Sequence, residues 1–196
     1  MSKGRLEAFS DGVIAIIITI MVLELHTPEA ANLHALRPLV STFLSYALSF
    51  VFIGIYWNNH HHILQTARHV DGGVLWANLH FLFWLSLIPF ATRWVGESDF
   101  AELPMASYGV VLLLTAIGYT ILVRMLIRHH STGHDPSEVQ LAEAIGRDRK
   151  GWVSLALYVV AIPVAFLASW LAGALFVAVA IIWLIPDRRI ERLFAD

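Results

Sequence analysis

Long stretches without a charged residue recur along the chain. Residues 38–67, 72–92 and 103–123 contain no Asp, Glu, Lys or Arg, and each could cross the ~30 Å hydrocarbon core of a bilayer as one helix. The uncharged stretch 151–186 would extend roughly 54 Å as a single helix, which is far longer than that core. It therefore predicts two short helices joined by a turn within 169–173.

The first apolar stretch is less regular than the others. Gly12–Leu23 is uncharged over only 12 residues, and Asp11 and Glu24 flank it. A helix here crosses a membrane only if protein or water surrounds its polar ends. The whole pattern predicts an all-α integral membrane protein, one domain over 1–196 with six transmembrane helices over 5–26, 38–67, 72–94, 103–128, 151–168 and 171–186.

The basic residues gather on one side of this predicted layout. Eleven of the 13 Lys and Arg residues lie in the N-terminal segment, in 65–71, in 124–150 and in the C-terminal tail, which leaves Arg37 and Arg93 on the other side. Short loops rich in Lys and Arg stay in the cytoplasm. We therefore expect a multi-pass protein with both termini cytoplasmic and with 129–150 as a cytoplasmic linker.

Composition narrows the possible functions. The chain is 58% hydrophobic and 14% charged, whereas soluble domains contain about 25% charged residues. The lipid bilayer is therefore the expected surrounding, and no nucleic-acid partner is expected. The lack of Cys excludes disulfides, thiolate metal sites and a Cys nucleophile. No P-loop, G-x-S-x-G or dinucleotide-binding fingerprint occurs, so the sequence does not predict an enzyme.

Two features of the first predicted helix have more than one explanation. An ionisable group near membrane depth usually faces a partner or water, but a helix-end residue at the interface explains Asp11 equally well. Ile16, Ile20 and Leu23 share one helix face, and Thr19 borders it. These apolar side chains could simply face lipid or packed helices, with the Thr19 hydroxyl bonded to its own backbone.

A motif at the start of this helix is similar to a family signature. Arg5-x-x-x-Phe9-Ser10-Asp11 resembles the RxxxFSD motif of the transmembrane protein 175 family of potassium channels. The positions that follow it at the family's spacing are Ile16, Thr19 and Leu23.

Two later segments carry the same resemblance. The run from Trp57 through His60 to His61 resembles the family's Trp-x-x-His-His pattern, and Asn78 with residues 86–90 resembles its third helix. The six-span layout is similar to the bacterial branch, in which one chain holds one six-helix repeat.

The resemblance implies a potassium-permeable channel in the plasma membrane. Four copies would form a homotetramer whose central pore is lined by the first helix. Ile16 would form an apolar constriction, with Ile20 and Leu23 lining the path outward and Thr19 hydroxyls favouring potassium. A narrow apolar tube gates by dewetting, and the chain has no Thr-Val-Gly-Tyr-Gly filter. Glu24 would lie at the outer mouth, where it either raises the local cation concentration or only occupies the interface.

The resemblance also implies a structural role for the polar residues near the start of the helix. They would form a network that holds the first helix against the second and third. Its expected members are Arg5, Phe9, Ser10, Asp11, Trp57, His60 and Asn78. No cofactor is implied, and the expected ligands are permeant K⁺ and other monovalent cations.

Two other classes of protein remain open from the residues. A secondary transporter could use Asp11 as an ion or proton relay, although no inverted repeat of the kind found in such proteins is recognisable. A membrane metalloenzyme could use the run His60-His61-His62. Neighbouring helical side chains point about 100° apart, so these three cannot easily share one ion, and we expect no metal site.

Overall fold

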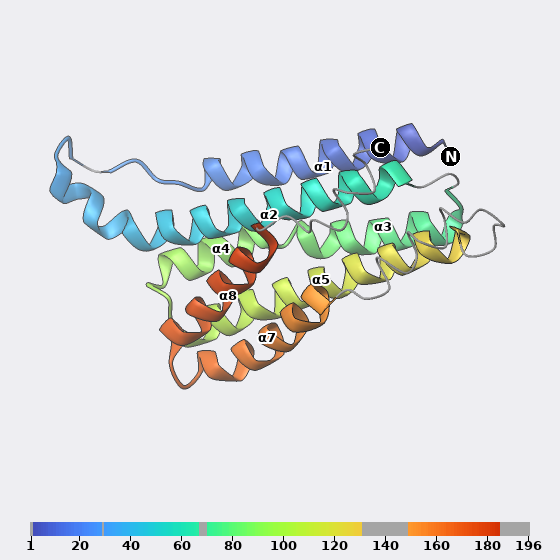
Figure 1. The fold of residues 1–196 in the computed structure, drawn as a ribbon. Coiled ribbons are helices and arrows are strands. Elements are labelled where there is room, and N and C mark those ends of the chain that lie inside the picture. The colour runs from blue at the N-terminus through green and yellow to red at the C-terminus, as the bar shows by residue number, and fades with distance from the viewer. Residues whose placement is uncertain (1, 29, 67–69, 131–148, 185–196) are drawn as a thin grey trace.

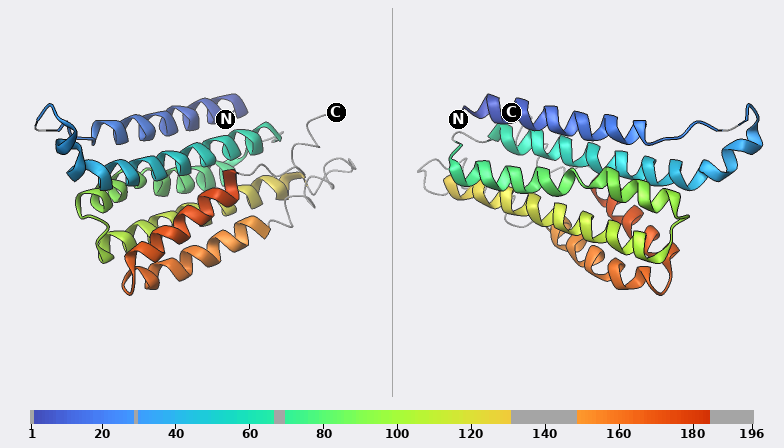
Figure 2. Two further views of the ribbon diagram at one scale, coloured as in Figure 1. Left: turned by 60° about the vertical axis from the view of Figure 1, so that its left-hand side comes forward. Right: turned by 180° about the vertical axis from the view of Figure 1, so that it is seen from behind.

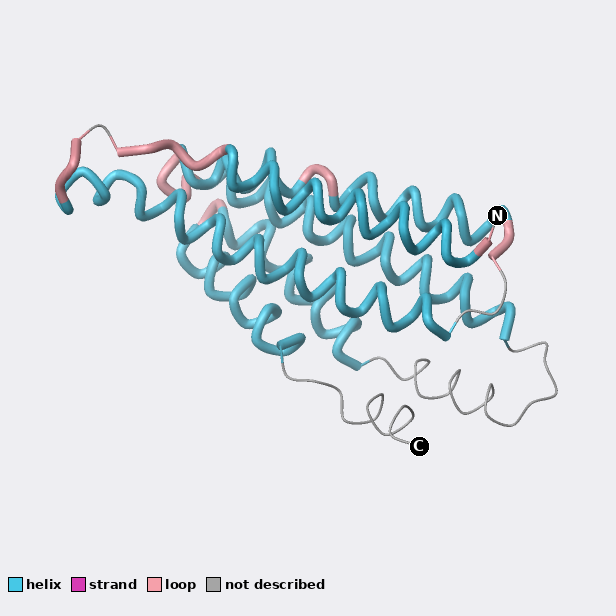
Figure 3. The backbone as a smooth tube through the Cα atoms, turned by 90° about the horizontal axis from the view of Figure 1, so that it is seen from above, coloured by secondary structure: helices cyan, strands magenta, loops and turns pink. Residues whose placement is uncertain are grey.

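The computed structural model describes residues 2–28, 30–66, 70–130 and 149–184, and its regular structure within these ranges is entirely helical (Figure 3). One element, η1 (Leu33–Leu39), is a 3₁₀-helix that leads directly into α2. The α-helices are α1 (Lys3–Leu23), α2 (Val40–Thr66), α3 (Gly72–Leu85), α4 (Ile88–Glu97), α5 (Glu102–His130), α7 (Arg149–Ala165) and α8 (Ser169–Leu184).

The helices lie side by side in one elongated bundle (Figure 1). Helix α1 lies at one edge, where it packs against α2, α3 and α4. Helix α5 packs against α3 and α7 in the middle of the bundle, and α7 pairs with α8. In both views of Figure 2, α1 and α7 lie at opposite edges of the bundle. One side of α1 is therefore covered by its own chain, whereas its other side is open.

Four segments are long and apolar enough to cross a membrane, judged by length and composition: Lys3–Leu23, Leu33–Gln65, Gly72–Glu97 and Glu102–Ile127. Helix α8 is strongly apolar but has only 16 residues, and α7 has 17. The described part of the chain therefore supports a multi-pass membrane protein. That all six predicted helices cross the bilayer stays a prediction.

The third predicted helix, over 72–94, is not continuous. It is broken at Ser86–Leu87 into α3 and α4. Pro89 explains the break, because it stands at the start of α4 and cannot donate a hydrogen bond to the carbonyl of Leu85. Within the break, the Ser86 hydroxyl donates to the carbonyl of Phe83 at 2.7 Å.

The predicted turn between the last two helices is wrong by a few residues. Residues 169–173 lie within α8, and the turn falls at 166–168. The backbone N–H groups of Phe166 and Leu167 donate to the carbonyls three residues earlier, at 3.2 and 3.0 Å. Such tightened bonds are typical of a helix end. Most of the predicted linker, 131–148, and the end of the last predicted helix, 185–186, lie outside the described residues.

Helices α2 and α4 approach each other closely at Gly96. A Cβ atom added at Gly96 would lie 2.8 Å from both Ser45 Oγ and Thr42 Cα. Just beyond, the Ser41 hydroxyl donates to Asp99 Oδ1 at 2.7 Å. Small residues on both helices therefore allow this close contact, as they commonly do between membrane helices.

Replacing this glycine should loosen the contact. We expect Gly96→Ala to lower the free energy of unfolding by about 1 kcal/mol, because the backbone of Thr42 must shift to admit the new methyl group. The matched control is Gly54→Ala on α2, where an added Cβ meets nothing within 4 Å. Denaturant titration of both variants measures the difference, and equal stabilities would show that the α2–α4 contact is not tight.

Candidate functional site

Helix α1 has one buried and one exposed face. The buried face points at α2, α3 and α4 and consists of Leu6, Ser10, Ile14, Ile17 and Met21. The opposite side, which we call the exposed face of α1, carries Phe9, Gly12, Ile16, Thr19, Ile20 and Leu23. Ile16 is 58% exposed and Leu23 is 82% exposed. The predicted stripe of Ile16, Ile20 and Leu23 therefore points away from the packed side of its own chain.

Thr19 is bonded to its own helix and also lies on the exposed face of α1, so the two explanations of this residue do not exclude each other. Its hydroxyl donates to the carbonyl of Ile16 at 2.9 Å, so the side chain is bonded to its own helix. The residue nevertheless lies on the exposed face of α1. The hydroxyl oxygen, which has two acceptor lone pairs, is thus held on the apolar face beside Ile16.

A chain of hydrogen bonds ties the buried face of α1 to α2 and α3. Asn78 on α3 is at its centre: its Nδ2 donates to Ser10 Oγ at 3.0 Å, and its Oδ1 lies 2.8 Å from His60 Nε2. Because the amide oxygen can only accept, His60 Nε2 must carry the proton. Ser10 in turn donates to the carbonyl of Leu6 at 2.9 Å. We call Ser10, His60 and Asn78 the buried triad, since all three are fully buried.

The ring of His60 is also held by packing. It stacks nearly parallel on Phe81 of α3, with ring centroids 5.7 Å apart and planes 16° apart. Its Nδ1 is one of the buried polar atoms without a hydrogen-bond partner in the described part of the chain. The stacking and the single hydrogen bond together fix the ring orientation.

A second set of contacts joins α1 and α2 near the start of the chain. Trp57 Nε1 donates to Asp11 Oδ1 at 3.0 Å. Closer to the helix end, Glu7 Oε1 lies 3.1 Å from His61 Nδ1, and Lys3 Nζ donates to the carbonyl of Gln65 at 2.6 Å. Asp11 is therefore a partner of a tryptophan indole, which explains how its charge is accommodated in an apolar helix.

Two residues expected in this network are not brought into it. The Arg5 side chain is exposed, and it makes no hydrogen bond or ion pair with another described residue. Phe9 lies on the exposed face of α1 and is 49% exposed. The network among described residues thus lacks two members of the seven-residue set. It also includes Glu7 and His61, which that set did not contain, although His61 belongs to the Trp-x-x-His-His pattern.

At the far end of α1, Glu24 belongs to a group of charged side chains. Its Oε2 lies 2.6 Å from Arg93 Nη1, and Arg93 Nε lies 2.8 Å from Glu97 Oε1. All three side chains are partly exposed. Arg93 was not singled out from the sequence, because it lies 69 residues from Glu24 and no local pattern connects them. The bridge fixes the end of α1 to α4.

The described residues contain no group of three or more His, Cys, Asp or Glu side chains arranged to hold a metal ion. His60 is buried, His61 is half-buried and His62 is exposed. Their different surroundings are consistent with side chains pointing to different sides of α2.

The family model covers the region that holds the buried triad. The family model described as "Endosomal/lysosomal potassium channel TMEM175" matches residues 5–89, which run from the start of α1 into α4. A potassium channel of Chryseobacterium sp. (strain P1-3) is 52% identical, over 98% of this chain and 97% of that protein.

Structural and more distant relatives agree with this assignment. The crystal structure of a lysosomal potassium-selective channel TMEM175 homolog from Chamaesiphon minutus superimposes with a TM-score of 0.79 at 28% identity, covering 93% of this chain and 96% of that one. The mouse endosomal/lysosomal proton channel TMEM175 is 26% identical over 91% of this chain, which spans 38% of its length. The chain is therefore a bacterial-type member of the TMEM175 family.

Proposed function

We propose that the chain is a potassium-permeable channel in which four copies assemble around a central pore lined by α1. The observation that carries this proposal is the exposed face of α1, a largely apolar surface from Phe9 to Leu23, with Thr19 as its polar residue, that its own chain leaves uncovered. The names of the bacterial relatives support potassium as the permeant ion. The family is one of ion channels and not of enzymes, and these names do not favour a secondary transporter that uses Asp11.

In this proposal the gate is made of side chains. Ile16 forms the narrowest ring, with Ile20 and Leu23 lining the path beyond it. A ring of branched apolar side chains excludes water from a narrow tube and therefore excludes ions until the tube widens. The exposure of all three side chains in the single chain supports this arrangement.

The polar contacts of α1 would keep this helix in one orientation. The buried triad holds its middle against α2 and α3, and the pairs Asp11–Trp57 and Glu24–Arg93 hold its two halves. Buried polar groups within a membrane must find partners inside the protein, so rotation of α1 would break several bonds together. Because Arg93 neutralises Glu24, any attraction of cations at the outer mouth comes from the net negative charge of Glu24, Arg93 and Glu97 together.

The orientation in the plasma membrane follows from the basic residues. Lys3 and Arg5 lie at the start of α1, Arg124 lies in the last two turns of α5, and Arg149 and Lys150 lie at the start of α7. Such basic residues at helix ends favour the cytoplasm. We therefore place the N-terminus in the cytoplasm. The C-terminal tail, with the same proposed location, lies outside the described residues.

Thr19 should influence ion preference if its hydroxyl faces the pore. We expect Thr19→Val, which keeps the side-chain shape but removes the hydroxyl, to lower the ratio of potassium to sodium permeability by about twofold, or ~0.4 kcal/mol. Bi-ionic reversal potentials in planar bilayers measure this ratio. Thr120→Val is a suitable control, because Thr120 also bonds its own helix but lies on α5. An unchanged ratio in Thr19→Val would remove Thr19 from the selectivity mechanism.

Potassium flux from liposomes that contain the purified protein tests the proposed function. We expect wild-type protein to release K⁺ faster than empty liposomes when the membrane potential is clamped with a protonophore. Absence of any cation flux from both the wild type and a variant with a widened constriction would rule out a channel.

A further inference from the structure

Two arginines border the uncharged stretches of α5 and α7. Arg124 directly follows the uncharged residues 103–123 of α5, and Arg149 lies two residues before the uncharged stretch 151–186, at the start of α7. The two helices pack against each other. Basic residues that border a membrane-spanning stretch lie at the level of the lipid headgroups. Both guanidinium groups are therefore expected at that level, on the same side of the membrane.

An exposed tryptophan lies beside both arginines. The guanidinium carbon of Arg124 lies 5.9 Å from the centre of the Trp152 ring on α7, which is the distance of a cation–π contact. Arg149 precedes Trp152 by three residues, so the two side chains share one face of α7. The Trp152 side chain is 64% exposed. One surface of the α5–α7 pair thus carries two arginines and the indole between the two helices.

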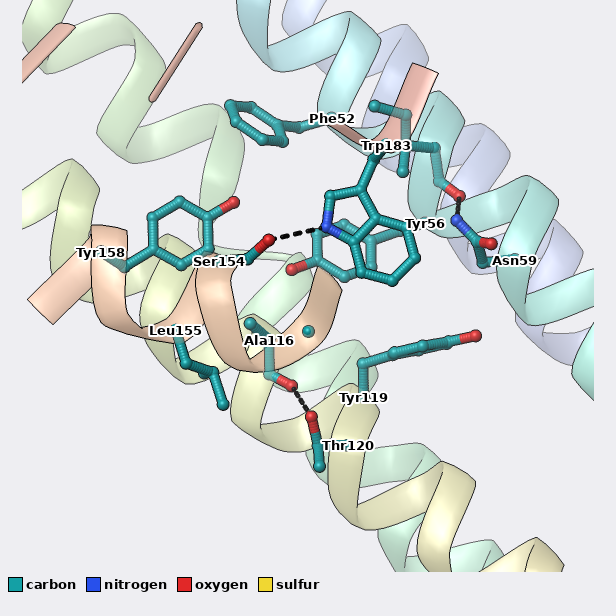
Figure 4. A pocket seen from close by; sticks show the side chains of 12 residues that line it. Phe52, Tyr56, Asn59, Ala116, Tyr119, Thr120, Ser154, Leu155, Tyr158 and Trp183 are labelled. Atoms are coloured by element: carbon teal, nitrogen blue, oxygen red, sulfur yellow. Dashed lines mark hydrogen bonds between the residues drawn. The ribbon is translucent and has the colours of Figure 1, made fainter. Parts of the chain in front are cut away.

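The opposite side of α7 is fixed within the bundle. The buried Ser154 hydroxyl accepts a hydrogen bond from Trp183 Nε1 of α8 at 2.9 Å (Figure 4). The same hydroxyl donates to the carbonyl of Lys150 at 2.8 Å. These bonds tie the first turns of α7 to α8, so Arg149 and Trp152 are held on the outer side of the bundle.

The positive charge of the two arginines is not neutralised within the described part of the chain. Both side chains are exposed, and neither guanidinium forms a hydrogen bond or an ion pair with another described residue. Guanidinium groups suit phosphate, because their paired N–H donors match two phosphate oxygens. Two of them favour a headgroup with net negative charge over a zwitterionic one, whose ammonium group they would repel.

The surface next to the arginines is apolar. Val153, Val159 and Val160 on α7 are exposed, as is Ile121, which lies one turn before Arg124 on α5. Acyl chains can lie along these side chains while the phosphate remains at the level of the arginines. A free phosphate ion would use only the charged part of this surface, whereas a phospholipid uses all of it.

We propose that Arg124, Arg149 and Trp152 form a binding site for an anionic phospholipid. Its phosphate contacts the two guanidinium groups, and its acyl chains follow the exposed face of α7. Basic residues between membrane helices on the cytoplasmic side are a known means of binding anionic headgroups. Helix α7 lies at the opposite edge of the bundle from α1 (Figure 2), so this site does not depend on whether α1 lines a pore.

Native mass spectrometry of the purified protein, with equal amounts of phosphatidylglycerol and phosphatidylcholine in detergent, measures the preference. Each arginine should contribute about fivefold, the effect of one basic residue near a bilayer surface, so we expect the wild type to prefer phosphatidylglycerol by about twentyfold. Arg124→Gln and Arg149→Gln should each reduce this preference about fivefold, and the double variant should show none. Arg37→Gln is the matched control, because it removes another exposed arginine, in η1, and should keep the wild-type preference.

Three results would overturn the site. The first is equal retention of the two lipids by the wild type, or an unchanged preference in the double variant. The second is a loss in Arg37→Gln as large as in the other single variants, because total charge alone would then attract the lipid. The third is displacement of the lipid by excess inorganic phosphate, which would mean that the arginines bind a phosphate group without the acyl chains. The substituted side chains are all exposed, so the variants should fold, which gel filtration verifies.

Discussion

Replacing Ile16 by Asn should raise potassium flux through the reconstituted protein by about tenfold, which corresponds to a barrier lower by ~1.4 kcal/mol. Ile16 is the first large apolar residue beyond Gly12 on the exposed face of α1. A carboxamide at this position offers hydrogen bonds to water, so a constriction that was dry in the closed state becomes hydrated and passes ions.

The control for this result is the same substitution on a different helix. Ile181 on α8 is 53% exposed, and it lies on a helix that is not proposed to line the pore. Ile181→Asn should leave the potassium flux unchanged. If both variants leak equally, a polar residue at any exposed position perturbs the bilayer, and the assignment of the gate to Ile16 would be wrong.

Breaking the buried triad should have the largest effect on stability. Asn78→Leu removes the bonds to both Ser10 and His60 and leaves the Nε2 proton of His60 buried without an acceptor. We expect the free energy of unfolding to fall by about 2 kcal/mol, the typical cost of a buried unpaired donor. Titration with a denaturing detergent, followed by circular dichroism, measures this change.

A second asparagine provides the comparison. Asn58 on α2 is exposed and takes no part in the triad, so Asn58→Leu should change stability by less than about 0.5 kcal/mol. The loss in Asn78→Leu should also be partly shared by Ser10→Ala, because the two residues bond each other. A stable Asn78→Leu protein would mean that packing alone, and not the triad, holds α1 in place.

Much of the fold could be predicted from the spacing of apolar residues. The uncharged stretches correspond to the long helices, and the length of 151–186 correctly required two helices instead of one. Local details of the helices were harder to predict from the sequence. Pro89 was visible in the sequence, but a proline in a membrane helix can kink or break it depending on its neighbours. The turn at 166–168 contains no glycine, so composition pointed instead to the nearby stretch that includes Gly173.

The candidate site could likewise be predicted only in part from the sequence. The family motif singled out Ser10, His60 and Asn78 together, although no physical pattern in the sequence links positions so far apart. Helical periodicity predicted which residues of α1 share a face. It did not predict which face the rest of the chain would cover. The pairing of Glu24 with Arg93 depends on a contact between distant helices, which no local property of the sequence encodes.

A single introduced cysteine shows whether the exposed face of α1 lines an ion pathway. The chain contains no Cys, so Leu23→Cys introduces one unique thiol on this face. Leu167→Cys provides the matched control, because Leu167 is 86% exposed in the turn between α7 and α8. The measurement is liposome potassium flux before and after a bulky cationic thiol reagent, with labelling verified by mass spectrometry. We expect labelling to block potassium flux through Leu23→Cys and to leave the flux through Leu167→Cys unchanged. Unchanged flux through fully labelled Leu23→Cys would contradict this expectation.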